Sequence, residues 1–363
     1  MVKPAADDKV HEFYCTSVSG LEEIVIDDLM TQLPGGSGFR SEKTGRHGRV
    51  FFHYERSPRR LLELNSVTNS FALLLEFRGV TSGRPGLVSL CEKIAQMNMV
   101  AARKLLAVCD PEAALDGYQL QASLRGRHRF SKDDLRRAVS SVLEKKHSLQ
   151  PGSGSGGGGM RFHLQVADRR ATLGLQLTSN RSPGSLEREG VARPFLYCIG
   201  RLLDLGAEAT VVVSACGPDA HLHLSPSAPL NMAIGCHHER RQAQPDSRPS
   251  SEAADQQVPT HAIRTVGLST DLPFATSRVD CIVTNEAGAP RAATKGSLSE
   301  CARILKPEGV AVVITASPAE FVQQIMQGEL PFAIGASLSA VVAGRKYVLF
   351  VLERLDLQSI SGV

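Results

Sequence analysis

Long apolar runs are missing from this chain of 363 residues. A membrane-spanning helix needs about 18 consecutive apolar residues, whereas apolar blocks such as 310–316 have only the length of a strand. The first ten residues carry four charged side chains and lack the apolar core of a secretory signal. Both absences predict a protein that stays in water inside the cell, in the cytoplasm or the nucleus, with no membrane partner.

Paired cysteines are also absent. The eight cysteines are dispersed without any C-x-x-C spacing, which disfavours a disulfide framework and a zinc ribbon. We therefore expect most of them to be buried thiols. The run Cys-His-His-Glu at 236–239, with His221 and His223 before it, offers contiguous ligands that cannot easily surround one ion, so we expect no metal site there.

The chain has little net charge overall, but basic residues are concentrated in one segment. The 41 Lys and Arg residues against 37 Asp and Glu give a net charge of +4, which is too small to indicate a partner. Between positions 125 and 146, however, eight basic residues face three acidic ones. This segment is either an electrostatic footprint for nucleic acid or a solvated helix face with salt bridges. Its basic residues are Arg125, Arg127, Arg129, Lys132, Arg136, Arg137, Lys145 and Lys146.

Chain length and hydrophobic periodicity indicate three blocks. Domains of roughly 100–200 residues predict two or three of them in this chain. The first block, 11–80, has strand patterns at 12–17, 50–53 and 77–80, and helix patterns at 21–33 and 58–75. The second, 81–180, has a helix pattern at 87–106, strand patterns at 118–124, 160–166 and 171–177, and a glycine-rich loop at 151–159. Between the strand patterns at 118–124 and 160–166, Ser131 and Asp134 predict the start of a capped amphipathic helix.

The third block, 185–355, alternates strand and helix patterns. Helices are expected at 193–205, closed by Gly206, and at 297–305, with a turn at 306–309. Strands are expected at 210–215, 261–268, 279–284 and 310–316, followed by a hairpin of 337–342 with 347–352. In the polar segment 219–260 only 230–235 reads as a strand. Alternation of this kind predicts a parallel sheet covered on both faces, with the hairpin at its end.

Three stretches together resemble the THUMP-domain RNA methyltransferases. Phe13–Thr16 with Gly20-Leu21-Glu22 and 48–52 resembles the family's opening strands, and 125–146 resembles its THUMP core helix. The stretches 271–274, 279–284 and 302–309 resemble the LP-x loop, the VD-x-I strand and the R-x-LKPGG turn of a class I methyltransferase. The resemblance implies an α/β and α+β fold class with a ferredoxin-like unit at 11–80, a THUMP RNA-binding domain at 81–180 and a Rossmann-like methyltransferase domain at 185–355.

The resemblance also implies a site for S-adenosylmethionine. The family opens this site with D-P-x-C-G-x-G, and the matching stretch, 213–219, keeps Cys216 and Gly217 but has Asp219 at the second glycine. Cys216 and Gly217 are either cofactor ligands or the strand-end turn of a relic site. The acidic partner of the ribose is replaced by Cys236 or, if the register shifts, is Glu239.

The family's base-holding tetrad, Asn/Asp-x-Pro-aromatic, reads Asn285-Glu286-Ala287-Gly288 in this chain. Asn285 either accepts a hydrogen bond from the exocyclic amine of a flipped base or caps a loop. The implied activity is guanosine N2 methylation of tRNA or small nuclear RNA, with Asn285 as the catalytic residue.

Three functions remain open on the sequence. The first is RNA binding and methylation, with a small zinc-containing activator subunit docking near an exposed apolar edge at 310–316. The second is an inactive pseudo-methyltransferase that acts as an RNA-binding or assembly scaffold, favoured by the departures at 219 and 286–288. The third is a metabolite-binding Rossmann protein, which leaves the basic segment unexplained.

Overall fold

The structure is a computed structural model in which the chain forms two compact units. It describes residues 11–43, 45, 47–152, 159–178, 191–203, 208–216, 220, 224, 232–237, 262–266, 271–287, 289, 291–327 and 330–355. Unit 1 comprises 1–16, 26–42 and 49–181, and unit 2 comprises 17–25, 43–48 and 182–363. Within the described ranges, no helix has the length and apolar character that crossing a membrane requires.

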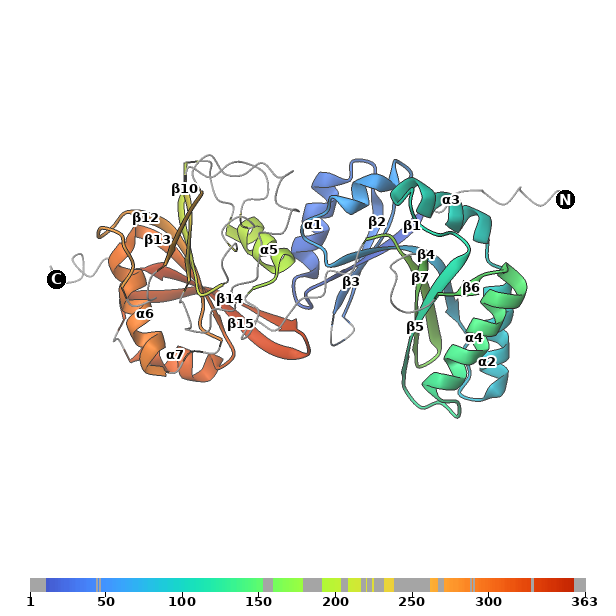
Figure 1. Ribbon diagram of the computed structural model, residues 1–363. Coiled ribbons are helices and arrows are strands. Elements are labelled where there is room, and N and C mark those ends of the chain that lie inside the picture. The colour runs from blue at the N-terminus through green and yellow to red at the C-terminus, as the bar shows by residue number, and fades with distance from the viewer. Residues whose placement is uncertain are drawn as a thin grey trace. The chain divides into compact units, whose positions relative to one another are not determined.

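Unit 1 is built on an eight-stranded mixed sheet with the order β2-β3-β1-β4-β8-β7-β5-β6. Its strands are β1 (Glu12–Ser17), β2 (Ser37–Lys43), β3 (Gly48–His53), β4 (Asn69–Arg78), β5 (Gly117–Arg125), β6 (Gln150–Pro151), β7 (Met160–Ala167) and β8 (Arg170–Gln176). Its helices are α1 (Glu22–Gln32), of which residues 26–32 belong to this unit, the short 3-10 helix η1 (Pro58–Leu62), α2 (Arg84–Ala95), α3 (Met99–Cys109) and α4 (Lys132–His147). Figure 1 shows α2 and α4 side by side on one face of this sheet.

The buried face of unit 1 follows from the period of its strands. In β7, Met160, Phe162, Leu164 and Val166 are buried at alternate positions, as expected for a strand with one face in the core. From α4, Leu135, Val139 and Leu143 point into the same unit and are buried. The helices therefore cover the apolar face of the sheet.

Two predictions in unit 1 are wrong. The expected helix at 58–75 is the 3-10 helix η1 followed by β4, which pairs antiparallel with β1 and β8. The Leu- and Ala-rich run 71–75 has helical propensity, but pairing on both edges overrides it. The expected helix at 87–106 is broken into α2 and α3, because the side chain of Asn98 accepts a hydrogen bond from the Ala101 N–H at 3.0 Å and starts a new helix.

Unit 2 is a Rossmann-like α/β domain with a seven-stranded sheet in the order β11-β10-β9-β12-β13-β15-β14. Its strands are β9 (Thr210–Ser214), β10 (Met232–His237), β11 (Ala262–Val266), β12 (Val279–Asn285), β13 (Leu305–Thr315), β14 (Phe332–Val342) and β15 (Arg345–Arg354). Its helices are α5 (Arg193–Leu203), α6 (Arg291–Ile304) and α7 (Pro318–Met326). Figure 1 shows α6 and α7 along one face of the sheet and α5 on the other. The predicted parallel sheet with a terminal antiparallel hairpin is confirmed.

The apolar block 310–316 lies inside this sheet. β13 pairs with β12 on one side and with β15 on the other, and Ala311, Val312, Val313 and Ile314 are fully buried. The expectation of an exposed apolar edge there is therefore wrong, because the terminal hairpin covers that edge. The predicted turn at 306–309 forms a bulge at the start of β13, with Glu308 at a φ of 64°.

The Gly20-Leu21-Glu22 turn packs within unit 2 against β14. The Val341 N–H donates to the Ser19 carbonyl at 2.8 Å. Gly20 has a φ of 102°, and a Cβ there would collide with the carbonyl oxygen of Ser339. The carboxylate of Glu22 accepts from the Gly20 N–H at 2.9 and 3.0 Å. Only glycine fits this close approach of two backbones.

Candidate cofactor site and nucleic-acid interface

The strand order of unit 2 reverses between β9 and β12. These strands are parallel neighbours, with Thr284 opposite Ser214 at the end of the pairing. Ligands of open α/β sheets bind outside the carboxyl ends of the strands at such a switch point. Cys216 follows β9, and Asn285 ends β12, so the structure places these two predicted site residues at the same edge of the sheet.

Cys216 is buried, with its thiol donating toward the Val283 carbonyl across 3.9 Å. Its own carbonyl accepts from the Val191 N–H at 2.8 Å. Burial, with a smaller contribution from the negative charge of Glu286, raises the pKa of the thiol well above its usual range. Cys216 is therefore a neutral thiol, and only the backbone around it is suited to face a ligand.

The chain turns sharply at the residue before Cys216. Ala215 has a φ of 55°, a left-handed conformation that is uncommon for alanine. Such strained residues cluster at ligand sites, where the surrounding structure holds them. Gly217, Asp219 and Glu239 lie outside the described residues, as does the side chain of Cys236, whose backbone is level with Ser214.

Asn285 is half-buried, and its Oδ1 accepts a hydrogen bond from the Ala287 N–H at 3.2 Å. This Asx-type turn is the loop cap that the sequence left open.

Glu286 is a residue at this edge to which the sequence analysis assigned no role. It is buried, and its Oε1 accepts from the Thr284 hydroxyl at 2.8 Å and from the Ser297 hydroxyl at 2.7 Å. Burial raises the pKa of this carboxyl, and hydrogen bonds from Ser297, Thr284 and Thr294 oppose the shift. An acid directly after an apolar strand was the available signal. Glu286 ties β12 to α6 beneath the site.

The motifs that carry the methyltransferase resemblance are structural. Arg303 donates to both oxygens of Glu300, at 2.6 and 2.8 Å, and to the carbonyls of Phe274 and Leu272. Glu300 in turn accepts from the Leu272 N–H at 2.8 Å. The helix α6 therefore holds the 271–274 loop in place.

Asp280 links the starting ends of three strands. It accepts from Lys306 Nζ at 2.7 Å and from the Thr210 N–H at 2.9 Å. Partial burial opposes ionisation, but these hydrogen bonds hold the pKa of Asp280 below its usual value. The ion pair lies at the opposite end of the strands from Cys216 and Asn285.

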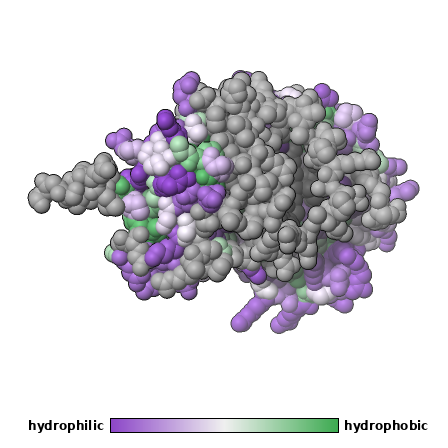
Figure 2. All heavy atoms as spheres, turned by 60° about the vertical axis from the view of Figure 1, so that its left-hand side comes forward, coloured by the Kyte–Doolittle hydropathy of each residue, from purple (hydrophilic) through white to green (hydrophobic). Residues whose placement is uncertain are grey.

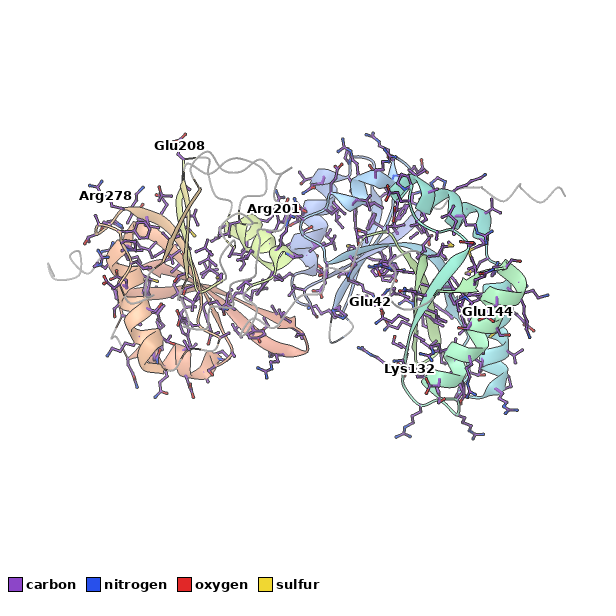
Figure 3. All side chains as sticks on the ribbon, viewed as in Figure 1. Glu42, Lys132, Glu144, Arg201, Glu208 and Arg278 are labelled. Atoms are coloured by element: carbon purple, nitrogen blue, oxygen red, sulfur yellow. The ribbon has the colours of Figure 1, made fainter. Side chains whose placement is uncertain are left out.

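All eight predicted RNA-contacting residues are exposed in unit 1. α4 begins with a capping box, in which the Asp134 N–H donates to Ser131 Oγ at 3.1 Å and the Ser131 N–H donates to Asp134 Oδ2 at 2.9 Å. Arg137 forms an exposed ion pair with Asp134 at 2.7 Å. Figure 3 labels Lys132 and Glu144 toward the two ends of this helix. Glu144 accepts from the Tyr118 hydroxyl at 2.8 Å and anchors α4 to β5.

The loop that carries Arg127 and Arg129 is held by backbone contacts. The Asp168 N–H donates to the Arg125 carbonyl at 3.1 Å, and the Arg129 N–H donates to the Ser82 carbonyl at 2.6 Å. Phe130 is buried at its end. The three arginine side chains are thus presented on a fixed backbone beside the start of α4.

Comparison with solved structures shows the fold. The chain is similar to TrmN from Thermus thermophilus, with 19% identity, a TM-score of 0.67, and coverage of 95% of this chain and 99% of that one. It is similar to the candidate methyltransferase SMU.472 complexed with SAH, at 11% identity, a TM-score of 0.64, and coverage of 94% and 98%.

A third similar structure is the predicted N6-adenine-specific DNA methylase from Listeria monocytogenes str. 4b F2365, at 14% identity, a TM-score of 0.58, and coverage of 94% and 95%. No protein-family model matches the chain, and no curated protein matches it. The likenesses bear out the predicted fold class, a mixed α/β chain with a Rossmann-like domain.

Proposed function

We propose that this chain is an intracellular RNA-binding protein with an S-adenosylmethionine-dependent methyltransferase site. The ferredoxin-like unit at 11–80 and the THUMP domain at 81–180 would bind tRNA or small nuclear RNA, and the domain at 185–355 would methylate guanosine N2. The observation that carries the proposal is the meeting of Cys216 and Asn285 at the switch point of unit 2. The full-length likeness to methyltransferase structures supports it.

The protein backbone at this edge of the sheet is suited to hold the cofactor. The left-handed turn at Ala215 directs the chain away from β9, and Cys216 is anchored by its buried thiol and carbonyl. In the proposed site, the backbone at 216 and 217 would hold the methionine end of S-adenosylmethionine, and Glu239 would accept from its ribose. The cofactor, when bound, supplies an electrophilic methyl group. SMU.472, a similar structure, is complexed with SAH.

The protein's own contribution to transfer is positioning. Asn285 Oδ1 would accept from the exocyclic amine of guanine and aim its nitrogen at the methyl group. Orientation of this kind can supply about 7–11 kcal/mol of a barrier. The hydrogen bond from the Ala287 N–H fixes Oδ1 in advance, so little reorganisation is needed when a base arrives.

RNA binding is supported by the exposed basic side chains on α4 and the loop before it. Each phosphate neutralised by Lys or Arg adds about 0.7–0.9 to the slope of log K against log salt. The expected test is a salt series of tRNA binding to the full chain. Arg136→Ala with Arg137→Ala should lower the slope by up to about two. The control replaces two exposed basic residues of unit 2, Arg278→Ala with Lys346→Ala, and loses the same charge. Equal slopes for both variants would contradict the proposed surface.

The methyltransferase proposal is tested by calorimetric titration of S-adenosylmethionine into the full chain. The titration is repeated with the small zinc-containing activator subunit that the family resemblance implies. Micromolar binding that Asn285→Ala leaves intact, together with methyl transfer to RNA that this variant abolishes, is the expected result. Absence of binding in both titrations, with salt-sensitive RNA binding retained, would contradict the methyltransferase activity. It would favour the inactive RNA-binding scaffold instead.

A further inference from the structure

Two histidines and a glutamate meet at one end of the sheet in unit 1. His11 precedes β1, His53 ends β3, and Glu55 follows two positions later. One ligand atom from each lies within 4.8 Å of the other two. His53 Nε2 and Glu55 Oε1 are 3.2 Å apart, and the His11 and His53 ring centroids are 5.5 Å apart.

These spacings are close to those around a tetrahedral zinc ion. With metal–ligand bonds of about 2.0–2.1 Å, neighbouring ligand atoms of a tetrahedron lie about 3.4 Å apart. Two imidazoles on the same ion then have ring centroids about 5 Å apart. Both distances agree with the structure to within about half an ångström, and the ligand atom of His11 lies within 4.8 Å of the other two.

The backbone already holds the two histidines together. β1 and β3 are neighbours in the sheet, and the Tyr54 N–H donates to the His11 carbonyl at 2.9 Å. The separation of positions 11 and 53 is therefore set by strand pairing. Ordering the site costs mainly the rotamers of three side chains.

A pocket of about 310 Å³ adjoins the cluster and supplies a second observation. His11 and Glu55 form part of its wall, beside Lys104 and apolar residues that include Phe13 and Leu105. Tyr54 also lines it, is 1% exposed, and has a hydroxyl without a hydrogen-bond partner. A buried hydroxyl without a partner is costly and points to a missing ligand or water.

We propose that His11, His53 and Glu55 bind a divalent transition-metal ion of the zinc class. Two histidines and one carboxylate are a donor set that zinc uses in sites with an open fourth position. Water, or a ligand in the adjoining pocket, would occupy that position. Cys15, which lies in β1, does not compete for the ion, because it is buried and donates its thiol proton to the Val50 carbonyl.

The test is zinc binding to the tag-free, chelator-treated full chain, measured by calorimetry with Zn²⁺ alone. We expect one tight site that His53→Gln and His11→Gln each weaken at least about tenfold. The matched control is His128→Gln, which removes a histidine of the same unit that contacts the Arg125 carbonyl. This control should leave the tight site unchanged.

Glu55→Gln provides an independent variant, since this exposed side chain can change without disturbing the core. It should also weaken zinc at least about tenfold, because the amide oxygen lacks the carboxylate charge. Melting temperatures of all variants are compared to confirm folding. The proposal is overturned if the full chain binds no zinc, or if the three site variants bind it as well as His128→Gln does.

Discussion

The buried carboxyl of Glu286 makes a prediction about stability against pH. Its pKa is raised above the ordinary value of 4.5 because burial disfavours the charged form. In the folded state it therefore holds a proton at pH values where the unfolded chain has lost it. The free energy of unfolding then falls as pH rises from about 4.5 through the folded pKa, by at most about 1.4 kcal/mol per pH unit for one proton.

Glu286→Gln removes this titration and keeps an acceptor for the hydroxyls of Thr284 and Ser297. The free energy of unfolding of Glu286→Gln, relative to that of the wild type, should therefore increase as pH rises from about 4.5 through the folded pKa. Glu286→Leu leaves both buried hydroxyls without their acceptor, and at about 1–3 kcal/mol for each it should cost about 2–6 kcal/mol. The hydroxyl bonds of 2.7 and 2.8 Å set this expectation.

Glu300 is the matched control with the opposite sign. Hydrogen bonds from Arg303 hold the pKa of Glu300 below its ordinary 4.5. Its stabilisation is present above the unfolded pKa and is lost as pH falls through the folded pKa. The stability of Glu300→Gln relative to the wild type should therefore decrease as pH rises toward 4.5. The stability of Glu286→Gln relative to the wild type should instead increase as pH rises above 4.5.

The assay is urea unfolding followed by far-ultraviolet circular dichroism over a series of pH values, since the chain has no tryptophan. Hydrogen exchange of peptides from β12 and α6 assigns the change to unit 2. The same sign of pH dependence for Glu286→Gln and Glu300→Gln would refute the opposite pKa shifts of the two carboxyls. A Glu286→Leu variant as stable as the wild type would refute the role of Glu286 as acceptor for the two hydroxyls.

Three further changes test single contacts. Gly20→Ala should cost about 2–4 kcal/mol through its φ and its clash with β14, whereas Gly38→Ala, at a φ of 65° with open space around it, should cost about 1 kcal/mol in urea unfolding. Ser131→Ala should cost about 1 kcal/mol, seen as faster hydrogen exchange in the first turn of α4, and Ser131→Asp should restore protection. Lys306→Ala removes a half-exposed ion pair with Asp280 and should cost only about 0.5 kcal/mol; a loss above about 2 kcal/mol would contradict this account.

Among the coloured residues on the face drawn in Figure 2, hydrophilic side chains predominate and hydrophobic ones form small patches. Exposed large apolar residues such as Met30, Val88 and Met326 lie far apart in the sequence. Exposed apolar residues are common on folded proteins and by themselves indicate no binding role.

Much of the local structure could be predicted from residue pattern alone. The strand at 12–17, the helix capped by Ser131, and the alternating strands and helices of unit 2 follow from hydrophobic period and capping chemistry. Of the seven cysteines whose burial the structure describes, five are buried, as expected. These features depend on near neighbours in the chain, which is why a sequence suffices for them.

Other features depended on contacts between distant residues. The run 71–75 is a strand because β1 and β8 pair with it, and the block 310–316 is covered because β15 lies beside it. The burial of Glu286, and the meeting of His11, His53 and Glu55, likewise join positions that no local pattern connects. Sequence by itself determined which segments become helices and strands around Cys216 and Asn285. Only tertiary structure decided that parallel pairing carries both to one edge of a sheet, because register is a property of paired strands.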